Sequence, residues 1–375
     1  MKEYKEILLS FSVGLAVFWT WPQITKTFRN EDRIETRESP TVLQGRGEDD
    51  QLSLSWGLEA IRAREGWRMA KGNKDVVVAV IDTGCDIHHP ALSENIWTNP
   101  GEDGLDENGN PKATNGRDDD GNGYVDDIHG WNFVNDSPDV TDDHGHGTHI
   151  AGIVGAKRLP GGGSSGVAPG VSLMILKYYD ADSGGEGNLV NTIRAIRYAT
   201  RMGARIINYS GGGILRSESE EAVLGMAAQK GVLFVAAAGN EGLNSDFFHF
   251  YPADYDLPNI ISVGASDRTG KLMAVSNFGR STVDIAAPGR NIHSTLPDGQ
   301  YGFMSGTSQA TAFVTGVAAL ILSQQGPLMK SDAVIQQIVS SRRALPSLRN
   351  RTVSGGILNA AQALETKTKP VAVGM

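Results

Sequence analysis

Short apolar segments that alternate with helical ones constrain the fold of this chain most. Residues 76–81 form a continuous run of apolar, mostly β-branched side chains, which is typical of a strand buried on both faces. Similar runs recur, and helical patterns lie between them. Alternation of this kind predicts an α/β fold with a mostly parallel central sheet flanked by helices. The further strands are expected at 173–176, 205–208, 232–236 and 260–263, and helices at 189–201 and 218–230.

Polar residues stand just beyond the ends of three of these predicted strands. Asp82 follows the first run, Ser210 follows the run at 205–208, and Asn240 follows the run at 232–236. In open parallel sheets the working groups lie beyond the carboxyl ends of the strands. The sequence therefore predicts a functional site at that edge.

Three motifs far apart in the chain supply the residue types of a catalytic triad. Asp82 lies in Val-Ile-Asp-Thr-Gly, His146 in His-Gly-His-Gly-Thr-His, and Ser308 in Gly-Thr-Ser-Gln-Ala-Thr. A serine becomes a nucleophile when a base takes its proton, and a carboxylate orients that base. Each residue alone has a simpler explanation, such as a turn cap for Asp82 or a helix N-cap for Ser308. Their order of acid, base and nucleophile favours the triad.

These motifs, with Phe-Val-Ala-Ala-Ala-Gly-Asn-Glu-Gly at 234–242, resemble the subtilisin-like serine proteases (subtilases, peptidase family S8). The resemblance extends from about residue 56 to about residue 363. It implies a three-layer subtilisin-like fold and a serine endopeptidase that forms an acyl-enzyme. The catalytic residues would be Asp82, His146 and Ser308, Asn240 would donate to the oxyanion, and His149 would be structural.

The same resemblance suggests how a polypeptide substrate binds. Ser210, Gly211 and Gly212 correspond to the substrate-binding segment of the family, and glycines there leave the backbone accessible to an extended peptide. Family members often carry a larger side chain where Gly211 stands. Glu241 and Phe250 are candidates for the first specificity pocket, by their closeness in sequence to Asn240 and to a Tyr-Pro pair at 251–252.

Beside the nucleophile, the chain departs from the usual family pattern at two positions. Gln309 replaces a methionine and Ala312 replaces a proline. Neither change removes a catalytic group.

An acidic stretch at 117–127 has the spacing of a calcium loop. Positions one, three and five carry Asp, Asp and Asn, and position six is glycine, but position twelve is a histidine where an EF-hand has glutamate. One of the aspartates at 126 and 127 would supply the missing carboxylate. A solvated acidic loop remains the alternative. The candidate ligands of a structural Ca²⁺ are Asp118, Asp120, Asn122, Tyr124 and Asp127.

The N-terminus differs in character from the rest. Residues 7–21 are almost wholly apolar and precede Pro22, which indicates a signal peptide or an uncleaved signal anchor. We therefore expect an exported protein that is secreted, periplasmic or membrane-anchored outside the cytoplasm. The predicted organisation is a signal or anchor at 1–24, a short linker or pro-segment at 25–50, a catalytic domain at 51–366 and a tail at 367–375.

Composition and cysteine content limit the partners and the disulfides that we expect. The net charge of −9 argues against nucleic acid as a partner. Cys85 is the one cysteine, so no intrachain disulfide forms, and we interpret it as a packing residue. We expect a monomer that acts on polypeptides. The alternatives are a silent peptide-binding module and a maturation protease with one dedicated partner, while a lipase is disfavoured because Ser308 lacks a Gly-x-Ser-x-Gly setting.

Overall fold

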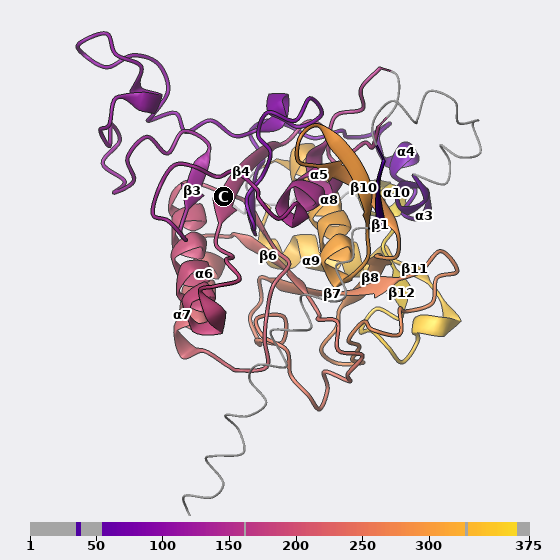
Figure 1. Ribbon diagram of the computed structural model, residues 1–375. Coiled ribbons are helices and arrows are strands. Elements are labelled where there is room, and N and C mark those ends of the chain that lie inside the picture. The colour runs from indigo at the N-terminus through magenta and orange to yellow at the C-terminus, as the bar shows by residue number, and fades with distance from the viewer. Residues whose placement is uncertain (1–34, 39–54, 161–162, 327–328, 366–375) are drawn as a thin grey trace, which may run out of the picture.

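A nine-stranded sheet forms the centre of the computed structural model, which describes residues 35–38, 55–160, 163–326 and 329–365 (Figure 1). Neighbouring strands of this sheet are parallel, except for its last pair at one edge. The order across the sheet is β11 (Arg343–Ala344), β12 (Gly356–Ile357), β8 (Ile285–Pro288), β7 (Ile260–Ser266), β6 (Leu233–Ala237), β5 (Ile206–Tyr209), β2 (Val77–Asp82), β4 (Ser172–Lys177) and β3 (Gly130–Asn132).

Helices cover both faces of this sheet, and the side chains of β2 show how. Val78 and Val80 pack into the core on one face, whereas Ala79 and Ile81 pack into the core on the other. The result is the three-layer arrangement that the sequence predicted. On the first face lie α3 (Trp56–Ala60), α4 (Ala63–Gly66), α5 (His146–Gly155), α8 (Thr307–Gln325), α9 (Ser331–Ser340) and α10 (Ala360–Glu365), and on the second α6 (Gly184–Arg201) and α7 (Glu218–Gln229).

A smaller antiparallel sheet consists of β1 (Glu35–Glu38), β10 (Gln300–Met304) and β9 (Ile292–Leu296). β1 lies within the stretch 25–50, for which we predicted a short linker or pro-segment. Its sequence, Glu-Thr-Arg-Glu, has no apolar alternation. A pattern-based prediction therefore had no signal for it.

α8 packs closely on Val167, and α5 packs closely on β9, because each helix has a glycine at the contact. A Cβ added to Gly316 of α8 would lie 2.4 Å from Cβ of Val167, and one added to Gly152 of α5 would lie 2.1 Å from Oγ1 of Thr295. No side chain fits at these distances. The two helices that begin at His146 and Thr307 are thereby held at fixed depth in the core.

The predicted strands and helices are confirmed with small shifts of their ends. β2, β4, β5 and β6 differ from the expected ranges by one residue at each end, and β7 continues three residues further. α6 begins at Gly184, five residues before the expected start. Its first turn contains Gly184, Gly185 and Gly187. Glycine is a poor helix former, so the sequence pattern did not predict this turn as helical.

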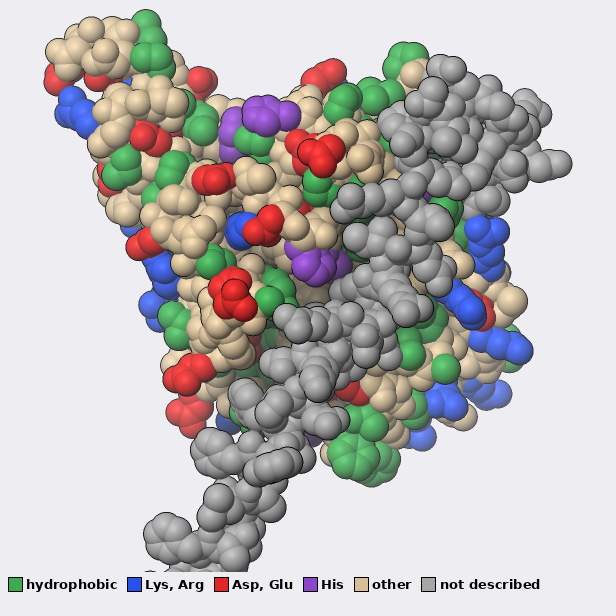
Figure 2. Space-filling view, in the orientation of Figure 1, with side chains coloured by type: hydrophobic (Ala, Val, Ile, Leu, Met, Phe, Trp, Pro, Cys, Tyr) green, Lys and Arg blue, Asp and Glu red, His purple; other side chains and the backbone are tan. Residues whose placement is uncertain are grey.

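Charged side chains on the face shown in Figure 2 are mixed in sign. Lys and Arg gather mainly toward the edges, and Asp and Glu are spread between them.

The predicted signal or anchor at 1–24 and the tail at 367–375 lie outside the described residues and stay predictions. Across the ranges that the structure describes, no helix combines the length and the apolar character needed to cross a bilayer.

Candidate active site

Asp82, His146 and Ser308 are placed by three elements at the carboxyl edge of the sheet. Asp82 is the last residue of β2, His146 is the first of α5, and Ser308 is the second of α8. Oδ1 of Asp82 and Nδ1 of His146 are 2.7 Å apart, a hydrogen-bond distance. All three residues are buried. α5 and α8 pack against each other, so the helices that begin with His146 and Thr307 are neighbours in the fold.

Asn240 and Ser210 lie directly beside Ser308. The Thr307 amide and hydroxyl both donate to Oδ1 of Asn240, at 3.0 and 3.1 Å, which leaves its Nδ2 as the donor end. The Ser308 hydroxyl donates to the backbone oxygen of Ser210 at 3.3 Å. The serine is thus held between the segments that follow β5 and β6.

The glycines after Ser210 are required by their neighbours. A Cβ on Gly211 would lie 2.2 Å from the Tyr178 hydroxyl, and one on Gly212 would lie 2.4 Å from Cε1 of Phe250. The departure at Gly211 from the larger residue of the family therefore has a physical reason, because Tyr178 occupies the space that a side chain would need.

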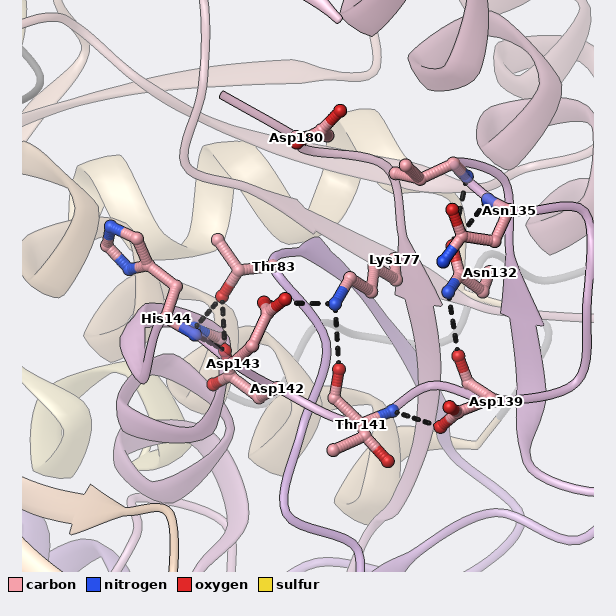
Figure 3. A network of polar contacts seen from close by, with 12 residues as sticks. Thr83, Asn132, Asn135, Asp139, Thr141, Asp142, Asp143, His144, Lys177 and Asp180 are labelled. Atoms are coloured by element: carbon pink, nitrogen blue, oxygen red, sulfur yellow. Dashed lines mark hydrogen bonds and ion pairs between the residues drawn. The ribbon is translucent and has the colours of Figure 1, made fainter. Parts of the chain in front are cut away.

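A buried carboxylate that the sequence analysis missed joins the strand end to the helix start. Asp142 accepts five hydrogen bonds, from the Thr83 hydroxyl, from the backbone amides of His144 and Gly145, and from the amide and hydroxyl of Thr148. Thr83 follows Asp82 directly, and its hydroxyl also accepts from the Gly147 amide at 2.9 Å. The group (Figure 3) therefore fixes the start of α5 against the end of β2. The only sequence signal was an aspartate four residues before His146.

The same hydrogen bonds keep Asp142 charged. Burial alone would raise its pKa, but the donors from Thr148, Gly145 and Thr83 outweigh burial, so that the pKa lies below its ordinary value. A negative charge at the first turn of α5 is also favourable to the helix dipole. Next to it, Lys177 at the end of β4 donates to Asp143 and to the Thr141 carbonyl (Figure 3).

The other candidates near the triad have structural surroundings. His149 is wholly buried and its Nε2 lies 3.0 Å from the Ile292 carbonyl, and burial lowers its pKa to about 3, so it is neutral at physiological pH. The ring of His144 lies edge-on to those of His146 and Tyr179. Cys85 is buried and free, and burial raises the pKa of its thiol well above the usual range, which makes it unreactive.

The acidic stretch forms a second cluster, in the part of the chain between β2 and β3 that extends from the body in Figure 1. Carboxylate oxygens of Glu102, Asp120 and Asp127 all lie within 4.8 Å of one another. Asn122 donates to both Asp120 and Asp127, at 3.2 and 2.8 Å. Of the predicted ligands, Asp120, Asn122 and Asp127 are thus brought together.

The remaining predicted ligands are placed differently. The carboxylate of Asp118 accepts from the backbone amides of Asn122 and Gly123 and so closes the turn of its own loop. The ring of Tyr124 packs edge-on against Trp131, Phe133 and Tyr198.

Glu102 is the member of the cluster that the sequence analysis missed. It is fully buried, its Oε1 accepts from the Asp119 amide at 2.8 Å, and its Oε2 has no hydrogen-bond partner among the described residues. Burial, and the nearby charges of Asp127, Asp119 and Asp120, raise its pKa. An unpartnered buried oxygen facing two carboxylates is what a bound cation would satisfy. Glu102 stands 16 residues before the loop, where no local spacing pattern includes it.

The chain is similar to known proteins over most of its length. A sequence model of the subtilase family, Peptidase_S8, matches residues 73–367. The major intracellular serine protease of Bacillus subtilis is 36% identical over 317 residues, covering 82% of this chain and 87% of that protein. Subtilisin-like protease 2 of Plasmodium falciparum is 32% identical over 326 residues, but this chain spans only 22% of its length. The crystal structure of MycP1 with the N-terminal propeptide removed superposes with a TM-score of 0.65 at 27% identity, covering 85% of this chain and 98% of that one.

The buried carboxylate gives a test of how His146 is positioned. In Asp142→Asn an NH₂ group replaces one acceptor and faces N–H and O–H donors, so the start of α5 must shift. We expect labelling of Ser308 by a fluorophosphonate to slow by about 10²-fold, since a displacement of about 1 Å can cost that much. The matched control is Asp143→Asn, whose side chain is 82% exposed and should leave the rate unchanged. An equal rate in Asp142→Asn and wild type would contradict this role.

Proposed function

The chain belongs to the subtilase family, whose members are serine endopeptidases, and we propose that it hydrolyses peptide bonds through an acyl-enzyme on Ser308. The observation that carries this proposal is the buried Asp82–His146 hydrogen bond at the start of α5, the helix packed against the one that bears Ser308. The catalytic roles of Asp82, His146, Ser308 and Asn240 are part of this proposal.

The geometry supports a division of roles among these three side chains. With Nδ1 of His146 donating to Asp82, the neutral imidazole keeps a lone pair on Nε2 for the proton of Ser308. As that proton moves, Oγ of Ser308 bonds to the substrate carbonyl carbon and its C=O electron pair moves to oxygen. The imidazolium then gives its proton to the leaving amine as the C–N bond breaks. His146 then takes a proton from a water molecule as its oxygen bonds to the carbonyl carbon of the ester. The imidazolium returns this proton to Oγ of Ser308 as the ester C–O bond breaks.

Two donors are suited to the oxyanion that forms in between. Ser308 lies in the first turn of α8, where backbone amides lack partners within the helix. Thr307 holds Asn240 by its oxygen, so the amide NH₂ can donate. Donors fixed before reaction stabilise the developing charge without reorganisation.

The substrate would lie as an extended strand along Ser210–Gly212. Ser210 contacts Ser308. Gly211 and Gly212 have no side chains that would shield their backbone groups from a peptide. Main-chain pairing binds peptides with little dependence on their sequence. A silent peptide-binding module would also use this segment, but it would have no need for the Asp82–His146 pair or for an oriented Asn240.

We further propose that the acidic cluster binds a structural Ca²⁺. Glu102, Asp120 and Asp127 offer carboxylate oxygens, and the backbone oxygen of Tyr124 is the next candidate. The side chain of Asn122 turns its NH₂ group toward Asp120 and Asp127, so it would orient these carboxylates and not bind the ion itself. The ion would neutralise charges that otherwise repel at close range and would take no part in hydrolysis.

We also propose export, on the strength of the apolar residues 7–21. The Bacillus relative is named an intracellular protease, so export would set this protein apart from it.

The oxyanion donor is tested by Asn240→Ala. The corresponding asparagine of subtilisin contributes about 10²–10³ in kcat, and we expect a loss of that size here with KM little changed, because the donor acts on the transition state. Steady-state hydrolysis of a peptide substrate measures it, with Ser308→Ala as the inactive control. An unchanged kcat would remove Asn240 from the mechanism.

Calcium binding is tested by thermal unfolding with excess Ca²⁺ and with chelator. A ligand at 100 times its Kd adds about 2.7 kcal/mol to the free energy of unfolding, so Ca²⁺ should raise Tm by several degrees. Glu102→Gln and Asp127→Asn should reduce this difference. Glu107→Gln, a carboxylate of the same region with its side chain 79% exposed, should retain it. If the Tm of the wild-type protein is the same with Ca²⁺ and with chelator, the result counts against the site.

Export is tested by fractionating cells that express the full chain or a variant without residues 1–24. We expect the full chain outside the cytoplasm and the shortened one inside. Full-length protein in the cytoplasm would refute the proposal.

A further inference from the structure

The proposed path of the substrate brings one substrate residue close to two segments of the enzyme. Ser308 and Asn240 fix the position of the scissile carbonyl, and the residue that carries it must pair near Ser210. β5 and β6 are neighbours in the sheet. That residue would thereby lie beside the space between the segment after β5 and the segment after β6. This step rests on the function proposed above.

Glycine lines both sides of that space. Gly211 and Gly212 stand on the side of β5, and Gly239, which directly precedes Asn240, stands on the side of β6. Walls without side chains would leave a slot that accepts a large residue. In many binding sites such a slot sets specificity through its depth.

The ring of Phe250 occupies this slot. A Cβ added to Gly212 would lie 2.4 Å from its Cε1 and 3.0 Å from its Cζ, and a Cβ added to Gly239 would lie 3.1 Å from its Cδ2. One edge of the ring thus faces the first wall and the other edge faces the second. Only 7% of Phe250 is exposed, so the ring is packed inside the protein.

Phe250 is also held in place by its backbone. Its amide donates to Oδ2 of Asp254 at 2.8 Å. The next residue, Tyr251, exchanges two backbone hydrogen bonds with Gly213, at 2.7 and 2.8 Å. The backbone that carries the ring is therefore tied to the wall beside it.

We propose that Phe250 closes the specificity pocket beside the scissile bond, so that the enzyme cleaves after glycine, alanine or serine and rejects large side chains. Its substrates are polypeptide segments with a small residue on the acyl side of the cleaved bond. Main-chain pairing with Ser210–Gly212 supplies the rest of the binding.

The experiment uses the full-length protein and a set of quenched fluorescent peptides that differ only at the acyl-side residue, as Gly, Ala, Ser, Leu or Phe. For wild type we expect kcat/KM for Ala to exceed that for Phe by at least about tenfold, which is within the range that pocket size can supply. Phe250→Gly should raise the ratio of kcat/KM for the Phe peptide to kcat/KM for the Ala peptide by at least about tenfold. Phe250→Val removes less of the side chain, so its ratio of kcat/KM for the two peptides should lie between those of wild type and Phe250→Gly.

The controls separate the pocket from general effects. Phe248→Gly, at a ring that is 63% exposed, should keep the wild-type preference. The wild-type profile is decisive even if Phe250→Gly does not fold. Equal cleavage after Ala and Phe by wild type, or a preference for Phe, would overturn the inference while leaving the protease function intact. If no peptide is cleaved and a fluorophosphonate fails to label Ser308, the proposed function itself fails, and the inference with it.

Discussion

The hydrogen bond between Asp82 and His146 joins the end of a strand to the start of a helix, and the site depends on that junction. Neither residue could be held by its own element alone, because strand ends and first helical turns are where backbone groups lack partners. Asp142 supplies those partners from a third segment, through Thr83 on one side and the amides before and within α5 on the other. A single buried carboxylate thus sets the relative position of acid and base.

Ser308, the proposed nucleophile, is positioned by packing instead. α8 is buried from Thr307 to Leu322, and it can enter the core only because small residues such as Gly316 let its neighbours approach. Burial fixes the axis of the helix, and Asn240 fixes its first residue through Thr307. Polar contacts at the helix end and apolar contacts along its length therefore restrain different degrees of freedom of Ser308.

Sequence predicted what is encoded locally. Strands buried on both faces are recognisable as uninterrupted apolar runs, and the polar residues at the carboxyl ends of β2, β5 and β6 could be proposed for the site from the topology of parallel sheets and from their motifs. Residues whose importance comes from distant neighbours could not be found in this way. Asp142 and Glu102 have no motif around them, and the closure of the slot by Phe250 depends on contacts with Gly212 and Gly239. The strand β1 had no apolar pattern to reveal it.

The acidic cluster and the triad are separate in the fold, and this separation decides what a calcium ion could affect. The Tyr198 hydroxyl donates a hydrogen bond to the Asp127 carboxylate, and Arg201 donates to the Asn122 carbonyl at 2.8 Å. The loop is therefore anchored on α6. α6 covers the face of the sheet opposite to α5 and α8. An ion there would strengthen the attachment of the loop to one outer layer, while the helices that bear His146 and Ser308 lie on the other. Its effect should therefore appear in the free energy of unfolding, with the chemistry at Ser308 unchanged in the folded protein.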